Sequence, residues 1–294
     1  MKKNILITGG SGYIGQILAF NLIKKFNIII IDKVKPNKII NKKVKFYKTD
    51  FSNKKYINKI FDKYDILVVI HLAAFIDAKE STIKKSKYLD NNYLKFLKFL
   101  NIIEKRKIQK VIFASSAAVY GNSKKTNSET LNAKPINWYG KSKLLSEIAL
   151  SKSKIKNKII LRFFNVVGAN KKNNLGQTSK NSKSLFRIIS NKIITNKVLC
   201  IYGINHNTKD GTTIRDYIHV EDIVKIIIEM IKIKKSISFK IFNCGYEKGY
   251  SIYQIIEAFK KITNKKVKIK VKKKVQGDIS NSVAKCNNLN KFID

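Results

Sequence analysis

Several residue types are rare in this sequence, and each shortage argues against a class of structure. There are two prolines, Pro36 and Pro135, so the chain offers few punctuated linkers between domains. The three cysteines lie far apart at Cys200, Cys244 and Cys286, a spacing that fits neither a disulfide framework nor a metal site. No apolar run approaches the roughly 20 residues that span a bilayer. We therefore expect a cytoplasmic protein without a metal or a membrane partner.

Acidic residues are also scarce, with 19 Asp and Glu against 61 Lys and Arg and a net charge of +42. Such an excess suggests nucleic-acid binding, because basic side chains neutralise phosphates. However, only four of the basic residues are Arg, the charges are spread along the chain, and Ile and Asn are enriched as well. Lys, Ile and Asn share adenine- and thymine-rich codons. We interpret the charge as a compositional bias and expect no nucleic-acid partner, while attraction of an anionic substrate stays open.

The N-terminal residues have the pattern of a nucleotide-binding β–α–β unit. A short apolar run at 4–8 precedes Gly9-Gly-Ser-Gly-Tyr-Ile-Gly15, and a helical pattern follows over 13–25. Glycines at this spacing allow a tight turn and let the backbone approach a pyrophosphate at the helix N-terminus. A second apolar run, 28–31, ends at Asp32, where an acid would bind ribose hydroxyls and repel the extra phosphate of NADP. The pattern therefore predicts NAD as the cofactor.

A second motif predicts proton transfer. Tyr139 and Lys143 are four residues apart and would share one face of a helix. A free phenol ionises at about pH 10, and a neighbouring ammonium lowers that pKa. A hydroxyl from the upstream Ser115-Ser116 pair would share the proton with a substrate oxygen. Ser116, Tyr139 and Lys143 are thus the candidate catalytic residues for moving a proton on or off a sugar or alcohol hydroxyl while a hydride leaves the same carbon.

The rest of the pattern alternates strands and helices. Repeated βα units favour a parallel sheet covered on both faces, so we expect an α/β protein with a Rossmann-type, doubly wound sheet. Loops are expected at 170–184 and 205–211, and the alternating segment 265–274 is interpreted as a strand with a wet basic face. The further expected strands are 44–48, 66–71, 110–115 and 158–163, and the further expected helices are 53–63, 84–104 and 139–152.

The order of these motifs resembles the UDP-glucose 4-epimerase family, within the extended short-chain dehydrogenase/reductase superfamily. The resemblance runs from residue 4 to about residue 285. The segment Asp210–Val220 is the most diagnostic, because related families share the other motifs more freely. The matching segments are Thr8–Gly15, His71–Ala74, Asp90–Asn92, Ser115–Gly121, Tyr139–Lys143, Leu161–Asn165 and Asp210–Val220.

The resemblance implies two parts and a retained cofactor. An NAD-binding core would span 1–165, the chain would return to it at about 212–245, and a smaller C-terminal α/β substrate domain would lie mainly within 166–294. In members of the family, NAD takes a hydride from the sugar C4 and later returns it. The residues that the resemblance assigns to NAD are Gly9, Gly12, Tyr13, Ile14, Gly15, Asp32, Asp50, Phe51, Ala73 and Lys143.

The resemblance also implies a UDP-sugar substrate and a mechanism. Tyr139 would take the proton of the C4 hydroxyl, the keto sugar would turn over in the pocket, and hydride would return to the opposite face, which interconverts UDP-glucose and UDP-galactose. Relatives commonly dimerise through the helices expected at 84–104 and 139–152, so a homodimer is expected. The residues assigned to the substrate are Asn92, Ser116, Tyr139, Asn165, Arg215, Asp278 and Ser282.

Departures from the family pattern leave alternatives open. Ala117 and Ala118 stand where related dehydratases carry acids, which disfavours elimination. Ser282 is small where some members carry Tyr, so a UDP-N-acetylglucosamine 4-epimerase or a dual-specificity enzyme is the first alternative. Lys274 lies one position from the place of an Arg that grips phosphate before Gly277-Asp278, so we expect weaker diphosphate binding. A non-catalytic, NAD-binding remnant is the other alternative.

Other polar residues are interpreted as structural. His71 lies at a predicted strand end and is expected to pack and to hydrogen-bond rather than to catalyse. Arg162 is interpreted as an ion-pair former at a strand end. Glu80, Glu129 and Glu147 are interpreted as ordinary surface acids.

Overall fold

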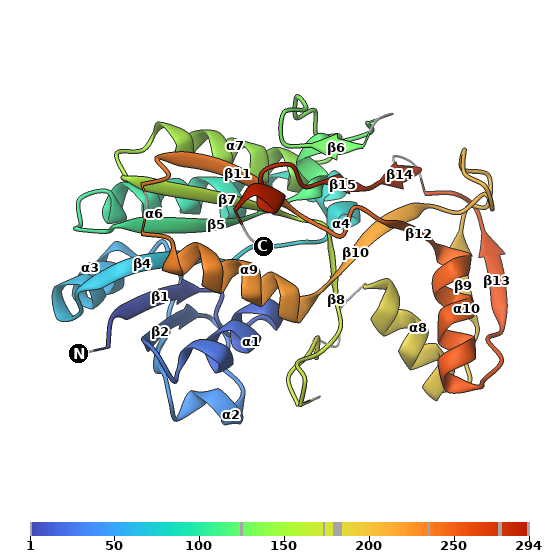
Figure 1. Ribbon diagram of the computed structural model, residues 1–294, viewed down its shortest axis with the longest axis horizontal. Coiled ribbons are helices and arrows are strands. Elements are labelled where there is room, and N and C mark those ends of the chain that lie inside the picture. Colours follow the sequence, from blue (N-terminus) through green and yellow to red (C-terminus); the bar gives the residue numbers. More distant parts are fainter. Residues whose placement is uncertain are drawn as a thin grey trace.

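The largest feature of the computed structural model is a sheet of seven parallel strands, in the order β11-β7-β5-β4-β1-β2-β3 (Figure 1). This order confirms the predicted Rossmann-type, doubly wound sheet. The residues that the structure describes are 2–123, 126–172, 174–178, 184–234, 236–275 and 278–292. The strands are β1 (Asn4–Thr8), β2 (Asn27–Asp32), β3 (Lys45–Lys48), β4 (Ile66–His71), β5 (Lys110–Ser116), β7 (Asn157–Phe163) and β11 (Phe239–Cys244).

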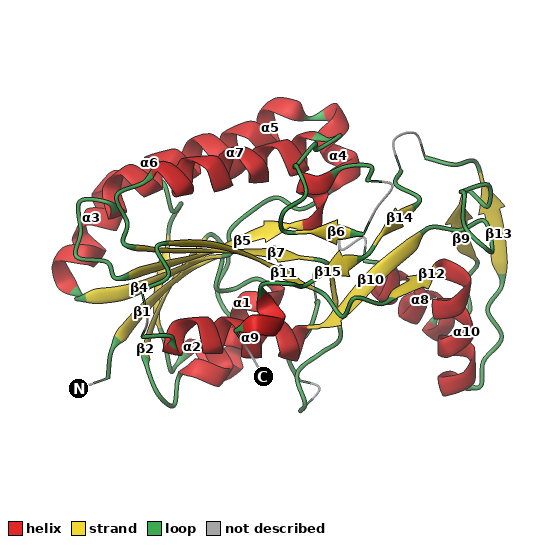
Figure 2. Ribbon diagram, turned by 45° about the horizontal axis from the view of Figure 1, so that its top comes forward, coloured by secondary structure: helices red, strands yellow, loops and turns green. Residues whose placement is uncertain are grey.

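Helices cover both faces of this sheet (Figure 2). Helices α3 (Lys54–Lys63), α6 (Lys95–Ile103) and α7 (Trp138–Lys152) lie on one face, and α1 (Tyr13–Leu22) and α9 (Val220–Lys232) lie on the other. The central strands are rich in Ile, Val and Leu because both of their faces are buried. Two apolar cores result, one on each face of the sheet. In such a sheet, ligands bind at the carboxyl ends of the strands.

The helix expected at 84–104 is confirmed, and a π-helical turn widens its middle. Helix α5 (Lys85–Leu89) and helix α6 flank a π-helical turn, η1 (Asp90–Leu94). This widened turn places Asn91 and Asn92 in the interior, where their polar side chains must find partners. The apolar spacing of the segment predicts helix throughout, and it contains no signal for the extra residue in one turn.

A smaller lobe lies at one end of the molecule (Figure 1). In it, β10 pairs with β8, β12 and β14, while β9 pairs with β13. Two helices pack on these strands through a third apolar core. Between β10 and β12 the chain returns to the large sheet to form α9 and β11. The elements of this lobe are β8 (Asn165–Val167), α8 (Leu185–Ile194), β9 (Leu199–Tyr202), β10 (Ile214–His219), β12 (Gly249–Ser251), α10 (Ile252–Thr263), β13 (Ile269–Lys272) and β14 (Asn281–Ser282).

The strand and loops predicted outside the main sheet are confirmed only in part. The basic strand expected at 265–274 is confined to β13, whose four residues are all exposed, so both of its faces are wet. The loop expected at 205–211 contains neither helix nor strand, and residues 173 and 179–183 of the other expected loop lie outside the described residues. The remaining short elements are α2 (Lys38–Asn41), α4 (Ala78–Ile83), η2 (Ala117–Tyr120), β6 (Asn127–Ser128), β15 (Ala284–Lys285) and η3 (Leu289–Lys291).

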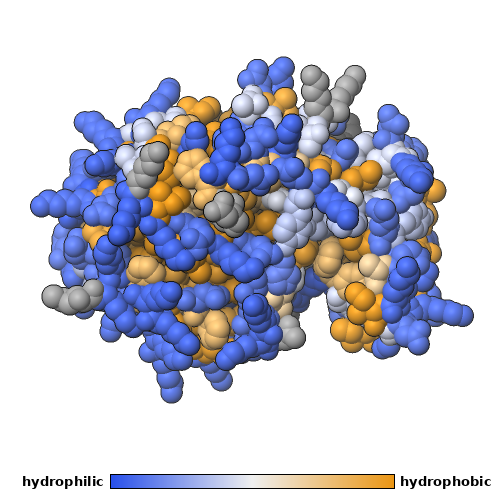
Figure 3. All heavy atoms as spheres, viewed as in Figure 1, coloured by the Kyte–Doolittle hydropathy of each residue, from blue (hydrophilic) through white to orange (hydrophobic). Residues whose placement is uncertain are grey.

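The surface reflects the composition of the chain. On the face seen in Figure 3, hydrophilic side chains are spread over both lobes, with apolar patches between them. Hydrophilic side chains are therefore distributed over the whole of this face rather than along one element. Among the residues that the structure describes, no helix is both long enough and apolar enough to cross a bilayer.

Candidate active site

The glycine-rich turn after β1 has a backbone that side chains would obstruct. Gly9 has a φ of +72°, and a Cβ placed on it would lie 2.6 Å from the main-chain nitrogen of Ala73. A Cβ on Gly15 would lie 2.4 Å from the carbonyl oxygen of Gly9. Gly12 precedes helix α1 and provides no capping side chain, so the first N–H groups of the helix are available to an anion. The turn therefore fits a bound pyrophosphate.

A cavity of about 280 Å³ opens beside this turn. Asp32, at the end of β2, accepts hydrogen bonds from the main-chain nitrogens of Ser11 at 3.0 Å and Val34 at 3.1 Å. Lys33 and Thr49 also line the cavity, although the motifs did not indicate them. Their position after the carboxyl ends of β2 and β3 is the signal that would have found them. The residues predicted to bind NAD that line the cavity are Gly9, Gly12, Asp32, Asp50, Phe51 and Ala73.

Four residues assigned to NAD lie outside the lining of this cavity, namely Tyr13, Ile14, Gly15 and Lys143. The Tyr13 hydroxyl donates to the carbonyl oxygen of Gly168 at 2.7 Å, and burial raises the pKa of this phenol. Ile14 packs against the core between α1 and the sheet. Their contact with NAD stays a prediction.

Asp50 follows β3, and its carboxylate binds several donors. Its carboxylate accepts from the ammonium groups of Lys33 and Lys95, each at 2.9 Å, and from the main-chain nitrogen and hydroxyl of Ser52. Burial alone would raise the pKa of this carboxyl, but the hydrogen bonds outweigh burial and hold the pKa well below its usual range. Asp50 is therefore ionised at neutral pH, and its bonds fix the wall of the cavity that continues into Phe51.

The predicted catalytic residues come from two elements. Ser116 ends β5, and Tyr139 lies in the first turn of α7, which Asn137 caps by accepting from the N–H of Gly140 at 2.8 Å. The Ser116 hydroxyl lies close enough to the Tyr139 phenol to affect its pKa. Burial raises the pKa of Tyr139, and the Ser116 hydroxyl acts in the opposite direction. The fold thus places a serine hydroxyl near the phenol, which is the arrangement that a shared proton requires.

Lys143 lies one turn further along α7 and is buried. Its ammonium donates to the carbonyl oxygen of Ala114 at 2.7 Å and lies 4.9 Å from the centre of the Phe113 ring. Burial lowers the pKa of Lys143 to about 7, and the charge of Glu147 opposes that shift. The lysine therefore stands between its two protonation states near neutral pH.

This lysine gives a testable pH dependence of stability. An unfolded lysine has a pKa of about 10.4, so from about pH 7 to 10 the unfolded chain holds a proton that the folded chain releases, and stability rises with pH. We expect Lys143→Met to raise the melting temperature near pH 7 by at least about 2–4 °C, with the gain shrinking as the pH rises. Thermal melts of both proteins across this range would measure it. A gain that does not change with pH would contradict the assignment.

The interpretation of Glu147 as a surface acid is wrong. Its carboxylate is buried beneath α7 and accepts from Nε of Arg162 at 3.0 Å, from Nη2 of Arg162 at 2.6 Å and from the hydroxyl of Ser115. The ion pair expected of Arg162 is confirmed. Glu147 is four residues after Lys143 and shares its helical face, but only the sheet beneath α7 makes that face interior. Glu147 therefore joins the helix to β5 and β7 at the level of the catalytic residues.

Of the other residues interpreted as structural, His71 and Glu80 are as predicted and Glu129 is not. His71 is buried, its ring stacks at 5.7 Å on that of Phe113, and its Nδ1 hydrogen-bonds the Thr8 hydroxyl at 2.8 Å, so the packing interpretation is confirmed. Glu80 pairs with nearby lysines at the surface. Glu129 is half-buried and accepts two main-chain N–H groups from distant segments, so it is not an ordinary surface acid.

Three residues assigned to the substrate lie together in the smaller lobe. Nη2 of Arg215 donates to Oδ1 of Asp278 at 2.9 Å, and Ser282 pairs in register with Arg215 between β14 and β10. Burial lowers the pKa of Arg215, and the charge of Asp278 opposes that shift. Gly277, in the segment where an Arg is missing, lies outside the described residues. An arginine held this way presents a planar fork that suits phosphate oxygens.

The two asparagines assigned to the substrate have different surroundings. The amide of Asn92 bonds both main-chain groups of Phe75, each at 2.9 Å, and donates to the Ser142 hydroxyl at 3.2 Å. Asn165 is exposed at the start of β8. Asn92 is therefore already satisfied by the protein, and a substrate contact would require it to exchange one of these partners.

The parallel sheet, the glycine-rich turn with its acid, and the Ser–Tyr–Lys arrangement define an enzyme of the extended short-chain dehydrogenase/reductase class. Residues 5–245 match the NAD dependent epimerase/dehydratase family. The sequence is 31% identical to the UDP-glucose 4-epimerase of Dictyostelium discoideum, over 97% of this chain and 88% of that protein. The chain belongs to the NAD-dependent epimerase/dehydratase family and, within it, to the UDP-glucose 4-epimerase family.

Further comparisons agree with this placement. The sequence is 34% identical to the UDP-glucose 4-epimerase of Lactobacillus helveticus, over 88% of this chain and 81% of that protein. The fold is similar to the crystal structure of UDP-glucose 4-epimerase from Bifidobacterium longum in complex with NAD+ and UDP, with a TM-score of 0.91 and 29% identity over 99% of this chain and 92% of that one. The recognition of the family from sequence motifs is confirmed.

Proposed function

We propose that this protein is an NAD-dependent epimerase that interconverts UDP-glucose and UDP-galactose through transient oxidation at the sugar C4. The observation that carries the proposal is the placement of Ser116, Tyr139 and Lys143 in a fold whose glycine-rich turn fits NAD. The close approach at Gly9 and the first N–H groups of α1 suit its diphosphate, and Asp32 suits a ribose. Bound NAD would supply a reversible hydride acceptor.

The residues of this chain would handle the proton. Tyr139 is assigned as the base that removes the proton of the C4 hydroxyl and returns it after inversion. Ser116, which lies near Tyr139, would orient the sugar oxygen. Because burial raises the pKa of Tyr139, the positive charge of Lys143 one turn away is needed to favour the phenolate.

Inversion fits the site better than elimination of water. Ala117 and Ala118 form the start of the η2 turn directly after Ser116, and neither can transfer a proton. The acid on α7, Glu147, is held beneath the helix by Arg162 and Ser115 and is therefore occupied. This arrangement supports simple oxidation and reduction at one carbon.

The smaller lobe is assigned to the UDP-sugar. In this division the core comprises 1–165 and the return at about 212–245, and the substrate domain lies mainly within 166–294. Arg215 would bind the diphosphate by exchanging its contact with Asp278, while Lys274 contributes a point charge rather than a second fork. Asn92, Asn165, Asp278 and Ser282 would complete the contacts with the nucleotide sugar.

A homodimer in the cytoplasm is part of the proposal. Helices α6 and α7 lie side by side on one face of the sheet, and the nearby Leu94 and Ile148 are apolar and exposed. The three cysteines are unpaired thiols, which suits a reducing compartment. Light scattering of the purified protein tests the dimer, because a mass near 33.8 kDa would be that of one chain and would contradict it.

The decisive assay mixes the purified protein with UDP-galactose and no added NAD, and follows UDP-glucose. We expect conversion toward equilibrium, because NAD is regenerated in each turnover and would remain bound from the cell. Failure to form product even with added NAD would contradict the proposed function. Retention of NAD without turnover would instead support the non-catalytic alternative.

A parallel reaction with UDP-N-acetylglucosamine addresses the second candidate substrate. Ser282 is half-buried, and its hydroxyl accepts a hydrogen bond from Nδ2 of Asn127 at 3.3 Å. A small side chain there favours space for an acetyl group, which is the observation behind this alternative. Turnover of both nucleotide sugars would identify a dual-specificity enzyme, and turnover of the unacetylated pair alone would exclude it.

A further inference from the structure

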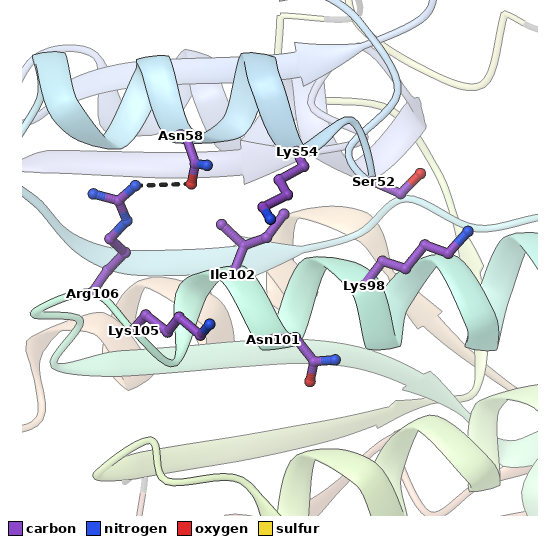
Figure 4. Close-up of a pocket in the computed structure, with 8 residues that line it drawn as sticks. All are labelled: Ser52, Lys54, Asn58, Lys98, Asn101, Ile102, Lys105 and Arg106. Atoms are coloured by element: carbon purple, nitrogen blue, oxygen red, sulfur yellow. Dashed lines mark hydrogen bonds between the residues drawn. The ribbon is translucent and has the colours of Figure 1, made fainter.

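A second and larger cavity, of about 500 Å³, lies between α3 and α6 (Figure 4). It is separate from the cofactor cavity, and the proposed function does not use it. Its rim carries four cationic side chains, Lys54 from α3, Lys98 from α6, and Lys105 and Arg106 from the turn after α6. Figure 4 shows Lys54 extending toward α6, while Lys98 extends from α6 to the right of the view.

One of these four charges is paired within the protein. Nη1 of Arg106 pairs with Asp62 at 2.7 Å, and its Nη2 donates to Asn58 at 2.8 Å, so the guanidinium is satisfied. In the part of the chain that the structure describes, the ammonium groups of Lys54, Lys98 and Lys105 form no ion pair. Like charges around one hollow repel each other unless an anion neutralises them. The protein itself therefore leaves a local excess of positive charge here.

Three acids lie near this cavity in the sequence, and each binds other groups. Asp50 binds the ammonium groups of Lys33 and Lys95, each at 2.9 Å, and accepts two further bonds from Ser52. Asp62 is held by Arg106, and Glu104 accepts from the main-chain nitrogen of Lys154 at 3.3 Å. An external anion would therefore meet three ammonium groups that form no ion pair among the described residues.

The helices that carry the lysines are firmly seated. Ile57 and Ile60 bury the inner face of α3, and Phe96, Phe99 and Ile103 bury that of α6, all in the same apolar core. The stems of the three lysines therefore start from fixed positions, which lowers the ordering cost of binding. Ile102 and the aliphatic parts of the lysines supply an apolar wall beneath the charges.

We propose that this cavity binds a small organic phosphate that carries at least two negative charges. Ammonium groups are good partners for phosphate oxygens, and three of them match a dianion or trianion better than a neutral ligand. The volume falls within the roughly 300–1,000 Å³ of small-molecule sites. The apolar wall suits the organic part of such a ligand.

One short segment, 50–52, lines both this cavity and the cofactor cavity. Ser52 lines the phosphate cavity, and its nitrogen and hydroxyl donate to Asp50 at 3.0 and 2.8 Å. Asp50 and Phe51 line the cofactor cavity. A ligand that draws on Ser52 or Lys54 therefore acts on the wall of the other cavity, and we expect it to change NAD affinity about five-fold or more, with the reciprocal effect.

Calorimetry with inorganic pyrophosphate as the probe tests the site. The titration uses full-length protein saturated with NAD and UDP, so that the cofactor and substrate sites are filled, at constant ionic strength. We expect saturable binding of one pyrophosphate per chain, weakened at least about ten-fold in Lys54→Gln/Lys98→Gln. The matched control is Lys266→Gln/Lys270→Gln, which removes the same charge at exposed positions on and before β13 and should bind as the parent does.

Several results would overturn the proposal. Absence of saturable binding to the parent protein would do so, as would equal weakening in the two double variants, which would reveal only the overall charge of the chain. Displacement of pyrophosphate by a short RNA that depends on Lys54 and Lys98 would replace the small ligand with a nucleic acid. Thermal melts of both variants show whether the fold is retained, which is expected because all four lysines are exposed. None of these outcomes depends on epimerase turnover.

Discussion

Replacement of Tyr139 by phenylalanine is expected to lower kcat for UDP-galactose by about 10²–10⁴-fold, the usual contribution of a positioned acid or base. The change removes the hydroxyl near Ser116 and keeps the ring at the start of α7. Because the glycine-rich turn and Asp32 are untouched, NAD binding should remain near that of the parent protein. The loss should therefore fall on kcat, measured as UDP-glucose formed with NAD present in excess.

A second phenylalanine variant controls for the loss of any phenol. Tyr56 lies exposed on α3 with 49% of its surface accessible, and Tyr56→Phe should turn over as the parent does. If Tyr139→Phe retains the parental kcat, the proton would have to pass through another group. If it loses NAD and turnover together, Tyr139 supports the cofactor site rather than the chemistry.

Replacement of Glu147 by alanine is expected to lower the free energy of unfolding by about 3–5 kcal/mol, because it strands the Arg162 guanidinium without its counter-charge. Both side chains are 4% exposed, so water cannot replace the lost carboxylate. The Ser115 hydroxyl loses its partner at the same time. Denaturant unfolding of the two proteins would measure the difference.

Two further variants test whether burial of the ion pair causes this loss of stability. Glu229 pairs with Lys232 on α9 with about half of each side chain exposed, and Glu229→Ala should cost less than about 1 kcal/mol. Glu147→Met/Arg162→Met removes both charges and should recover much of the stability lost in Glu147→Ala, since no ion is left stranded. Equal losses in Glu147→Ala and Glu229→Ala would show that the buried pair has no special weight.

The sequence predicted the parallel sheet well because its signals are local. The apolar runs at β1, β2, β4, β5 and β7 are visible residue by residue, and a strand buried on both faces needs no knowledge of its neighbours. The glycine-rich turn and Asp32 follow the same logic, because their spacing along the chain sets their geometry. The pairing of β11 beside β7 was not predicted, because it joins segments about 80 residues apart; the family resemblance implied only that the chain returns to the core at about 212–245.

The errors occurred where burial depends on packing between distant elements. Glu147 reads as a surface acid on a polar helix until β5 and β7 are placed beneath it. The π-helical turn at Asp90–Leu94 widens a helix whose apolar spacing gives no sign of it. The cavity beside Lys54 and Lys98 has no sequence signal, because lysines are abundant everywhere in this chain.

The elements, the turn that suits a dinucleotide and the tyrosine with its lysine could be predicted, because each depends on residues within a few positions of one another. The folded chain was needed to show which charges are paired in the interior, that Asp278 holds Arg215, and that three lysines line one hollow. The reason is that the free energy of a charge depends on its distance from other charges and from water, and chain folding sets those distances.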